Sequence, residues 1–301
     1  MRFFEKHPMA MIVIGIIGIS LSAIFVKYSS APSSVTAAYR LLWTVLLMTP
    51  VVLGKKSYRK ELRHTDRRTV WLCAVSGIFL ALHFTFWFES LNHTTVASST
   101  AIVCTEVIWV ALGFTIFMKG FLSRTAVISI AVTLAGSLLI AFSDSSGAHG
   151  SLYGDMLALA AAVFVAVYTL IGRIARTEMS TVSYTYIVYG FCSLSLLLIL
   201  LVQRTSLLGH GKSPAVVGLL LSIFSTLLGH SIFSWCLKFF SPAFVSASKL
   251  CEPVVASVFA VFLFQELPAA LQILGGLVTI GGVLLYSRAE ASEAKTPAGA
   301  D

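Results

Sequence analysis

The sequence predicts an all-α integral membrane protein with ten transmembrane helices arranged as two inverted five-helix repeats. Three observations lead to this fold class. Hydrophobic residues make up 57% of the 301 residues, whereas charged residues make up only 11%. Apolar runs of about 20 residues, long enough to cross a bilayer as a helix, recur along the whole length. Finally, the two halves of the chain resemble each other in the spacing of their polar residues.

Each apolar run is expected to form a helix, because a helix satisfies its own backbone hydrogen bonds where no water is available. Short loops, one basic loop and a polar tail are all that remain, so the chain has no room for a soluble catalytic domain and is not expected to be an enzyme. Neither metal-ligand spacing nor a cofactor motif is present. The expected spans are residues 8–26, 34–53, 70–88, 94–118, 125–142, 152–172, 181–202, 215–237, 242–264 and 268–287.

The repeat is visible in three pairs of residues separated by 147, 146 and 146 positions. These pairs are His83 and His230, Glu106 and Glu252, and Gly136 and Gly282. Ten spans in two copies give five spans per copy, and an odd number places the second copy upside down, as in many secondary transporters. We therefore expect a first repeat at 1–146, a second, inverted repeat at 147–288, and a disordered cytoplasmic tail at 289–301.

Orientation follows from the basic residues, which accumulate in cytoplasmic loops. With the N-terminus inside, 16 of the 21 lysines and arginines lie on the cytoplasmic side and three on the opposite side. Both termini are therefore expected to be cytoplasmic. This bias also accounts for the net charge of +8, which is no argument for nucleic-acid binding. The basic loop at 55–68 is expected to touch anionic lipid head groups.

Charged and titratable residues inside the spans are the most informative part of the sequence. A charge at bilayer depth costs about 2.5–3.5 kcal/mol on insertion scales, so it faces the bundle interior and takes a partner. These residues are Arg40, His83, Glu106, His230, Lys249 and Glu252.

Lys249 and Glu252 are three residues apart, so they share a helix face and are expected to pair. Lys249 then either holds a substrate carboxylate or belongs to a structural salt bridge, and the sequence leaves both interpretations open. Glu106 is either a proton-coupling carboxylate or the partner of Arg40 in a structural bridge, and the bridge is favoured.

His83 and Trp87 are four residues apart and therefore lie on one helix face, and His230 and Ser234 occupy the matching positions in the second repeat. Histidine can hydrogen-bond a ligand or carry a proton near neutral pH, although a lone histidine in an apolar helix is more often structural. Together with Lys249, these four residues are candidates for substrate binding, as are Tyr39 and Ser248.

Glycine and proline interrupt the same spans and are candidate hinges, because proline removes a backbone hydrogen bond and bends a helix. The candidate hinges are Gly77, Gly113, Gly229 and Pro253. The tenth span carries four further glycines spaced for close helix packing. They would also permit a homodimer, but packing within one chain is sufficient to explain them.

Several short segments form a recognisable pattern: residues 239–243 (FFSPA), 251–254 (CEPV) and 265–268 (QELP), with a similar pattern at 90–97 and at Glu106-Val107, and the sequence YRLL at 39–42. These segments resemble the repeat of the EamA family, within the drug/metabolite transporter superfamily. The first copy departs from the second by having Val107 in place of Pro253. It is therefore expected to bend less.

The resemblance implies a central cavity, alternating access and export of small metabolites across a bacterial inner membrane, without a cofactor. The chain is most similar to bacterial YddG-type amino acid exporters, which implies amino acids as substrates, either a broad range of them or aromatic ones. A zwitterionic amino acid needs a cation or donor for its carboxylate, which Lys249, His83 or His230 supplies. It also needs an acceptor for its ammonium group, which Glu252 or Glu106 supplies. The alternatives are a multidrug/proton antiporter, a nucleotide-sugar carrier and a membrane receptor or scaffold.

Overall fold

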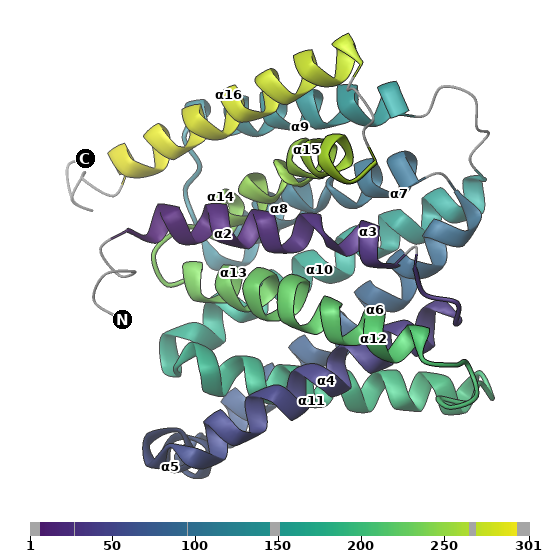
Figure 1. Cartoon of the computed structure of the whole chain (residues 1–301). Coiled ribbons are helices and arrows are strands. Elements are labelled where there is room, and N and C mark those ends of the chain that lie inside the picture. Colours follow the sequence, from purple (N-terminus) through teal and green to yellow (C-terminus); the bar gives the residue numbers. More distant parts are fainter. Residues whose placement is uncertain (1–6, 27, 95, 145–150, 265–268, 294–301) are drawn as a thin grey trace.

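The computed structural model describes residues 7–26, 28–94, 96–144, 151–264 and 269–293, and within them the chain forms helices and no strand (Figure 1). The helices of the first half are α2 (Pro8–Ser20), α3 (Ser22–Val26), α4 (Ser33–Gly54), α5 (Lys56–His64), α6 (Arg67–His93), α7 (Val96–Val103), α8 (Glu106–Met118) and α9 (Arg124–Asp144). Those of the second half are α10 (Leu152–Glu178), α11 (Thr181–Val202), α12 (Ser213–Leu220), η1 (Leu221–His230), α13 (Ser231–Cys236), α14 (Pro242–Lys249), α15 (Glu252–Phe264) and α16 (Ala270–Glu293).

Eight helical stretches of the described residues are long and apolar enough to cross a membrane, which confirms the all-helical membrane fold. A ninth apolar helix, Arg124–Ile140, is shorter. The expected span at 242–264 is divided between α14 and α15. Helix α16 continues to Glu293, past the expected start of the tail at residue 289, and residues 294–301 lie outside the described residues.

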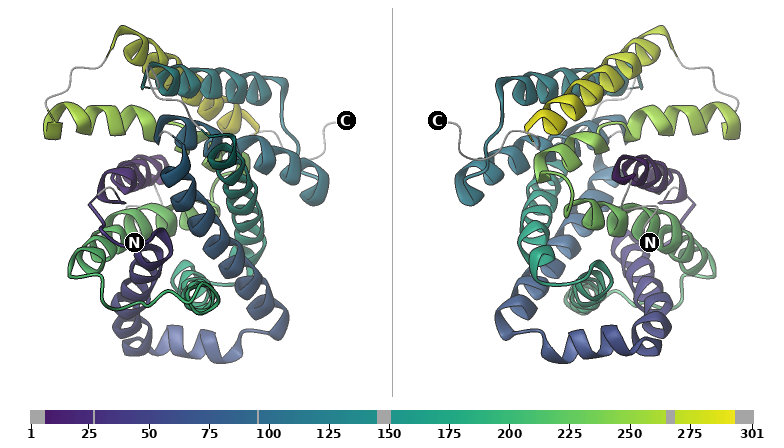
Figure 2. Two further views of the ribbon diagram at one scale, coloured as in Figure 1. Left: turned by 90° about the vertical axis from the view of Figure 1, so that its right-hand side faces the viewer. Right: turned by 90° about the vertical axis from the view of Figure 1, so that its left-hand side faces the viewer.

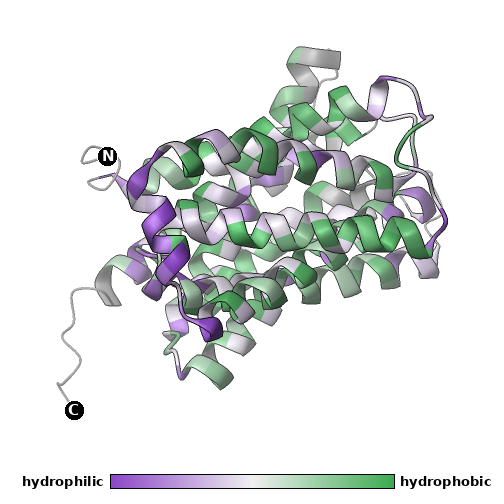
Figure 3. Cartoon of the chain, turned by 90° about the horizontal axis from the view of Figure 1, so that it is seen from below, coloured by the Kyte–Doolittle hydropathy of each residue, from purple (hydrophilic) through white to green (hydrophobic). Residues whose placement is uncertain are grey.

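Hydrophilic residues gather at the end of the bundle where α2 begins and α16 ends, which also carries α5 (Figure 3). We call this end the terminal end and the opposite one the distal end. Helix α5 crosses the terminal end between α4 and α6 (Figure 2). It is made mostly of exposed basic residues, because the sequence at 55–63 has no apolar run to bury.

Glu61 attaches α5 to the start of α11. Its carboxylate accepts hydrogen bonds from the Ser180 backbone N–H (2.5 Å), the Ser180 hydroxyl (2.6 Å) and the Ser183 hydroxyl (2.6 Å). Partial burial opposes ionisation of Glu61, but these hydrogen bonds outweigh it and lower its pKa below the ordinary value. The carboxylate therefore holds the first helix turn of α11 in place at the terminal end.

Glycines let α9 and α16 approach each other closely. A Cβ atom at Gly136 would lie 2.5 Å from the Thr279 backbone nitrogen, and one at Gly282 would lie 2.3 Å from Thr133 Oγ1. Gly275 similarly faces the Gly136 carbonyl oxygen, 2.7 Å from where its Cβ would be. These small residues therefore serve helix packing within one chain, as the spacing in the tenth span predicts.

The candidate glycine hinges are packing points as well. Gly77 lies inside the continuous helix α6 and approaches α11, Gly113 approaches α10, and Gly229 approaches α2. The interruptions described below lie at other residues, and the assignment of these three glycines as hinges stays a prediction. A buried glycine inside an apolar helix marked a close helix contact in all three cases.

Two interruptions occur at matching positions of the two repeats. Helix α7 gives way to α8 at residues 104–105, and α14 gives way to α15 at residues 250–251. At both, the backbone tightens to i→i+3 hydrogen bonds, from Thr105 to Ile102 (3.0 Å) and from Leu250 to Ala247 (3.1 Å). Short stretches of this kind within a helix often mark functional hinges.

Pro253 stands at the second position of α15, where its missing N–H costs nothing. The first copy is interrupted at the same place even though it carries Val107 there. Proline is therefore not required for the break.

Candidate functional site

A cavity of about 60 Å³ lies in the middle of the bundle, where the two interruptions meet. Helices from both halves of the chain contribute to its wall. All six charged or titratable residues expected inside the spans line it: Arg40, His83, Glu106, His230, Lys249 and Glu252. The structure thus brings together in one place the residues that the sequence indicated one by one.

Lys249 and Glu106 form an ion pair across the two repeats. Lys249 Nζ lies 2.8 Å from Glu106 Oε1, and the two side chains are 14% and 7% exposed. Lys249 is the last residue of α14 and Glu106 the first of α8. A cation at a helix C-terminus and an anion at a helix N-terminus are both favoured by the helix dipole.

This pairing corrects two expectations. Glu106 pairs with Lys249 and not with Arg40, and Lys249 pairs with Glu106 and not with Glu252 on its own span. The i, i+3 argument failed because the helix is interrupted between Lys249 and Glu252, which end one helix and begin the next. The regular helical geometry that brings residues three apart together does not hold across such a break.

Arg40 projects from α4 and is fully buried. Its Nε donates to Thr226 Oγ1 (2.7 Å), its Nη1 donates to Ser22 Oγ (3.5 Å), and its guanidinium lies 4.2 Å above the centre of the Phe84 ring. Thr226 belongs to η1, a π-helical segment of the kind often found at functional sites. Within the described part of the chain, no carboxylate lies within ion-pair distance of Arg40.

Glu252 lines the cavity as the first residue of α15. Its backbone carbonyl accepts a hydrogen bond from Ser20 Oγ (3.2 Å), which connects this break to α2. Among the residues that the structure describes, no lysine, arginine or histidine is within ion-pair distance of its carboxylate. The cavity therefore holds one closed ion pair and two further ionisable groups, those of Arg40 and Glu252.

His83 and Trp87 share a helix face, as their spacing predicts. Their rings stack at 5.9 Å with an interplanar angle of 15°, and the His230 ring centre lies 6.5 Å from that of His83. His83 Nδ1 lies 3.0 Å from the Ala161 carbonyl oxygen. Because a carbonyl can only accept, Nδ1 carries the proton, and Nε2 of the neutral ring is an acceptor.

Three polar groups of the cavity wall have no hydrogen-bond partner among the described residues. They are Trp87 Nε1, Ser225 Oγ and Ser246 Oγ. Nearly all buried polar side-chain atoms in proteins are hydrogen-bonded, so groups of this kind call for a partner supplied from the cavity.

Three candidate binding residues lie outside the cavity wall. Tyr39 packs toward α12, where the backbone approaches it closely at Gly218. Ser234 hydrogen-bonds with the Tyr168 hydroxyl (3.0 Å), and Ser248 donates to the Phe244 carbonyl oxygen (2.9 Å). The two serine hydroxyls are therefore used inside the protein.

The candidate residues drawn from the sequence do not include Ser22, Ser225 and Ser246, which all line the cavity. Ser246 lies three residues before Lys249, so its helix face was a usable signal. Ser22 and Ser225 had no such signal, because serine is common in these spans and usually bonds to its own helix backbone.

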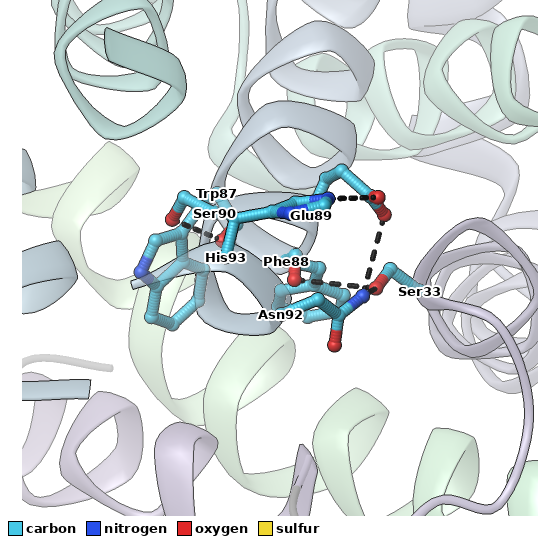
Figure 4. Close-up of polar contacts among 7 residues, drawn as sticks. All are labelled: Ser33, Trp87, Phe88, Glu89, Ser90, Asn92 and His93. Atoms are coloured by element: carbon cyan, nitrogen blue, oxygen red, sulfur yellow. Dashed lines mark hydrogen bonds and ion pairs between the residues drawn. The ribbon is translucent and has the colours of Figure 1, made fainter. Parts of the chain in front are cut away.

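Polar contacts hold the end of α6 beyond Trp87 (Figure 4). They fasten α6 to the start of α4 at the distal end and fix the last turns of the helix that carries His83 and Trp87. The contacts are Ser90 Oγ to the Trp87 carbonyl (2.7 Å), Ser33 Oγ to the Phe88 carbonyl (3.2 Å), Asn92 Nδ2 to Ser33 Oγ (2.9 Å) and to Glu89 Oε2 (3.4 Å), and His93 Nε2 to Glu89 Oε1 (3.1 Å).

A helical membrane bundle whose broken helices meet at a charged central cavity is typical of many secondary transporters. The sequence pattern of the EamA-like transporter family matches residues 7–142 and again residues 152–288. The chain therefore belongs to the EamA-like transporter family and is built from two EamA repeats.

Curated relatives agree with this assignment. An uncharacterized transporter of Bacillus subtilis, YxxF, is 25% identical over 282 residues, which cover 93% of this chain and 88% of that protein. An uncharacterized transporter of Archaeoglobus fulgidus is 24% identical over 83% of this chain and 86% of its own length. A solved crystal structure with 17% identity matches 95% of this chain and 98% of its own chain with a TM-score of 0.76, which supports the fold. The protein is thus a multi-pass membrane transporter.

Proposed function

We propose that this transporter exports amino acids by alternating access around the central cavity. The observation that carries the proposal is the presence of both signs of charge in one cavity wall, with Arg40 and Lys249 facing Glu106 and Glu252. An amino acid carries one charge of each sign, so such a wall matches both ends of it.

The same balance of charge argues against the alternatives. An organic cation needs a carboxylate in an otherwise apolar cavity, and two buried cations would repel it. A nucleotide sugar carries two or more phosphate charges and needs a surplus of cations. Here Lys249 is already matched by Glu106, which leaves one arginine and one glutamate.

In the proposed mechanism, the interrupted helices of the two repeats move against each other around the cavity. The Lys249–Glu106 pair joins α14 of one repeat to α8 of the other, so it holds the two interruptions together in this conformation. Glu252, which has no ion-pair partner among the described residues, is the carboxylate best placed to couple transport to protons.

Uptake by liposomes carrying the purified protein tests this proposal. A panel of radiolabelled amino acids is offered with and without an imposed proton gradient, alongside an organic cation and a nucleotide sugar, and protein-free liposomes serve as the control. Saturable uptake of neutral amino acids supports the proposal, and stimulation only by a gradient assigns coupling to protons. Uptake of the cation or the nucleotide sugar alone contradicts it.

In the proposed orientation, both termini and α5 lie on the cytoplasmic side of a bacterial inner membrane. The second repeat is inverted relative to the first. Single cysteines at exposed positions test it in whole cells with a membrane-impermeant maleimide, since the cysteines of the spans are mostly buried. We expect His210→Cys, in the distal loop, to be labelled and Lys60→Cys, in α5, to be protected. Labelling of Lys60→Cys alone would reverse the orientation.

A further inference from the structure

We infer that Arg40 and Glu252 are the two residues that recognise the charges of the substrate, and that the substrate is a small neutral amino acid. Arg40 binds its carboxylate and Glu252 binds its ammonium group. The Lys249–Glu106 pair stays closed as a structural element and does not bind the substrate. This inference rests on the proposed function and differs from the expectation that Lys249 holds the carboxylate.

The charges of Lys249 and Glu106 already neutralise each other. Its atoms are 2.8 Å apart, and each residue stands at the helix end whose dipole favours its charge. A substrate carboxylate that took Lys249 would leave Glu106, which is only 7% exposed, without its cation. Breaking a buried pair in this way is strongly unfavourable.

Arg40 is held in place by the protein and still has N–H groups that can donate to a ligand. Thr226, Ser22 and the Phe84 ring hold its guanidinium from the protein side. These contacts use two of the five N–H groups of an arginine. Three N–H groups remain, and a carboxylate accepts two of them in a bidentate arrangement.

Glu252 lies on the wall of the same cavity, with no ion-pair partner among the described residues. Arg40 and Glu252 are therefore ionisable groups of opposite type that line one cavity without forming an ion pair with each other. A zwitterion placed between them would neutralise both. A substrate with only one charge would leave the other buried and unpaired, which is costly.

The size of the cavity and its uncharged polar groups fit a small amino acid. About 60 Å³ holds roughly four to six water molecules, at about 10–15 Å³ for each. Alanine, serine and threonine are of this size, whereas an aromatic amino acid exceeds it in this conformation. Trp87, Ser225 and Ser246 are 6%, 0% and 1% exposed, and their unpartnered polar atoms can hydrogen-bond such a substrate.

The test measures how each variant discriminates among alanine, alaninamide and lactate. Alaninamide lacks the carboxylate of alanine, and lactate lacks its ammonium group. Purified protein in liposomes takes up radiolabelled alanine, and the other two compounds compete. In the wild type we expect alanine to bind at least tenfold better than either analogue. Arg40→Gln should remove the preference for alanine over alaninamide, and Glu252→Gln should remove the preference for alanine over lactate.

The double variant Lys249→Met/Glu106→Gln is the matched control, because it removes two charges of the same cavity together. It is expected to keep both preferences, whatever its absolute rate. The inference is overturned if Arg40→Gln and Glu252→Gln keep the wild-type preferences, or if the double variant is the one that loses them. Should Arg40→Gln fail to fold, Glu252→Gln decides alone, since its amide has nearly the shape of the carboxylate.

The wild-type measurement comes first, because it tests amino acid export separately from the roles of Arg40 and Glu252. If the wild type takes up alanine, only the assignment of Arg40 and Glu252 is at stake in the variants. If the wild type takes up none of the panel of amino acids, the proposed function fails and this inference falls with it. Saturable uptake of phenylalanine but not alanine would overturn the assigned substrate size and leave amino acid export standing.

Discussion

Replacing Lys249 by methionine is expected to destabilise the protein through the carboxylate it leaves behind. Methionine keeps most of the apolar stem of lysine, so little packing is lost. Glu106 then remains nearly buried, at 7% exposed, without its cation. Removing one partner of a buried ion pair costs about 3–5 kcal/mol, and the 14% exposure of Lys249 places this case near 3 kcal/mol. At about 2 °C for each kcal/mol in a chain of this size, the melting temperature should fall by about 6 °C.

The assay is a double-mutant cycle of Lys249→Met and Glu106→Gln. Thermal unfolding is followed with a thiol reagent, which reacts when the buried cysteines become accessible. The double variant should regain most of the loss and lie within about 1 kcal/mol of the wild type, because neither charge is left alone. Lys238→Met, at an exposed lysine, controls for the loss of a positive charge. Losses that simply add in the double variant would refute the reasoning.

Three further predictions concern single sites. Gly282→Ala should lower the melting temperature by several degrees, since its Cβ meets α9, whereas Gly281→Ala, with nothing within 4 Å, should leave it unchanged; equal effects would contradict the packing argument. Glu61→Gln should destabilise the protein at neutral pH. Because the pKa of Glu61 is lowered from 4.5, its stabilisation is present above pH 4.5 and lost as the pH falls below that value, so melting curves of the two proteins should converge in acid. Trp87→Phe removes an N–H with no partner among the described residues, so it should preserve the melting temperature while raising the KM for alanine several-fold; an unchanged KM would remove Trp87 from the site.

The charged lining of the candidate site was largely predictable because insertion into a membrane makes buried charge expensive. Each of the six charged or titratable residues found within the apolar spans had to face the interior, and all six line one cavity. The repeat spacing singled out Glu106 and Glu252 without any structure, and the helices are interrupted just before both of them. The stacking of His83 on Trp87 likewise followed from their spacing alone.

The partners of these charges were not predictable. Sequence spacing ranks neighbours on one continuous helix, so it paired Lys249 with Glu252, but the interruption at residues 250–251 separates them. Lys249 instead reaches Glu106, 143 positions away. The glycines were ambiguous for a related reason. A glycine in an apolar helix fits a hinge and a close helix contact equally well, and only the neighbouring helix distinguishes the two.

By itself, the sequence determined the membrane class, the approximate spans, the two-fold repeat and the set of residues that must face the interior. These properties depend on hydrophobicity and charge, which act locally along the chain. Only the tertiary structure decided which charge pairs with which, which serines line the cavity, and where the helices are interrupted. Those properties depend on how helices from the two repeats pack against each other, and pairing across about half the chain length leaves no local pattern to read.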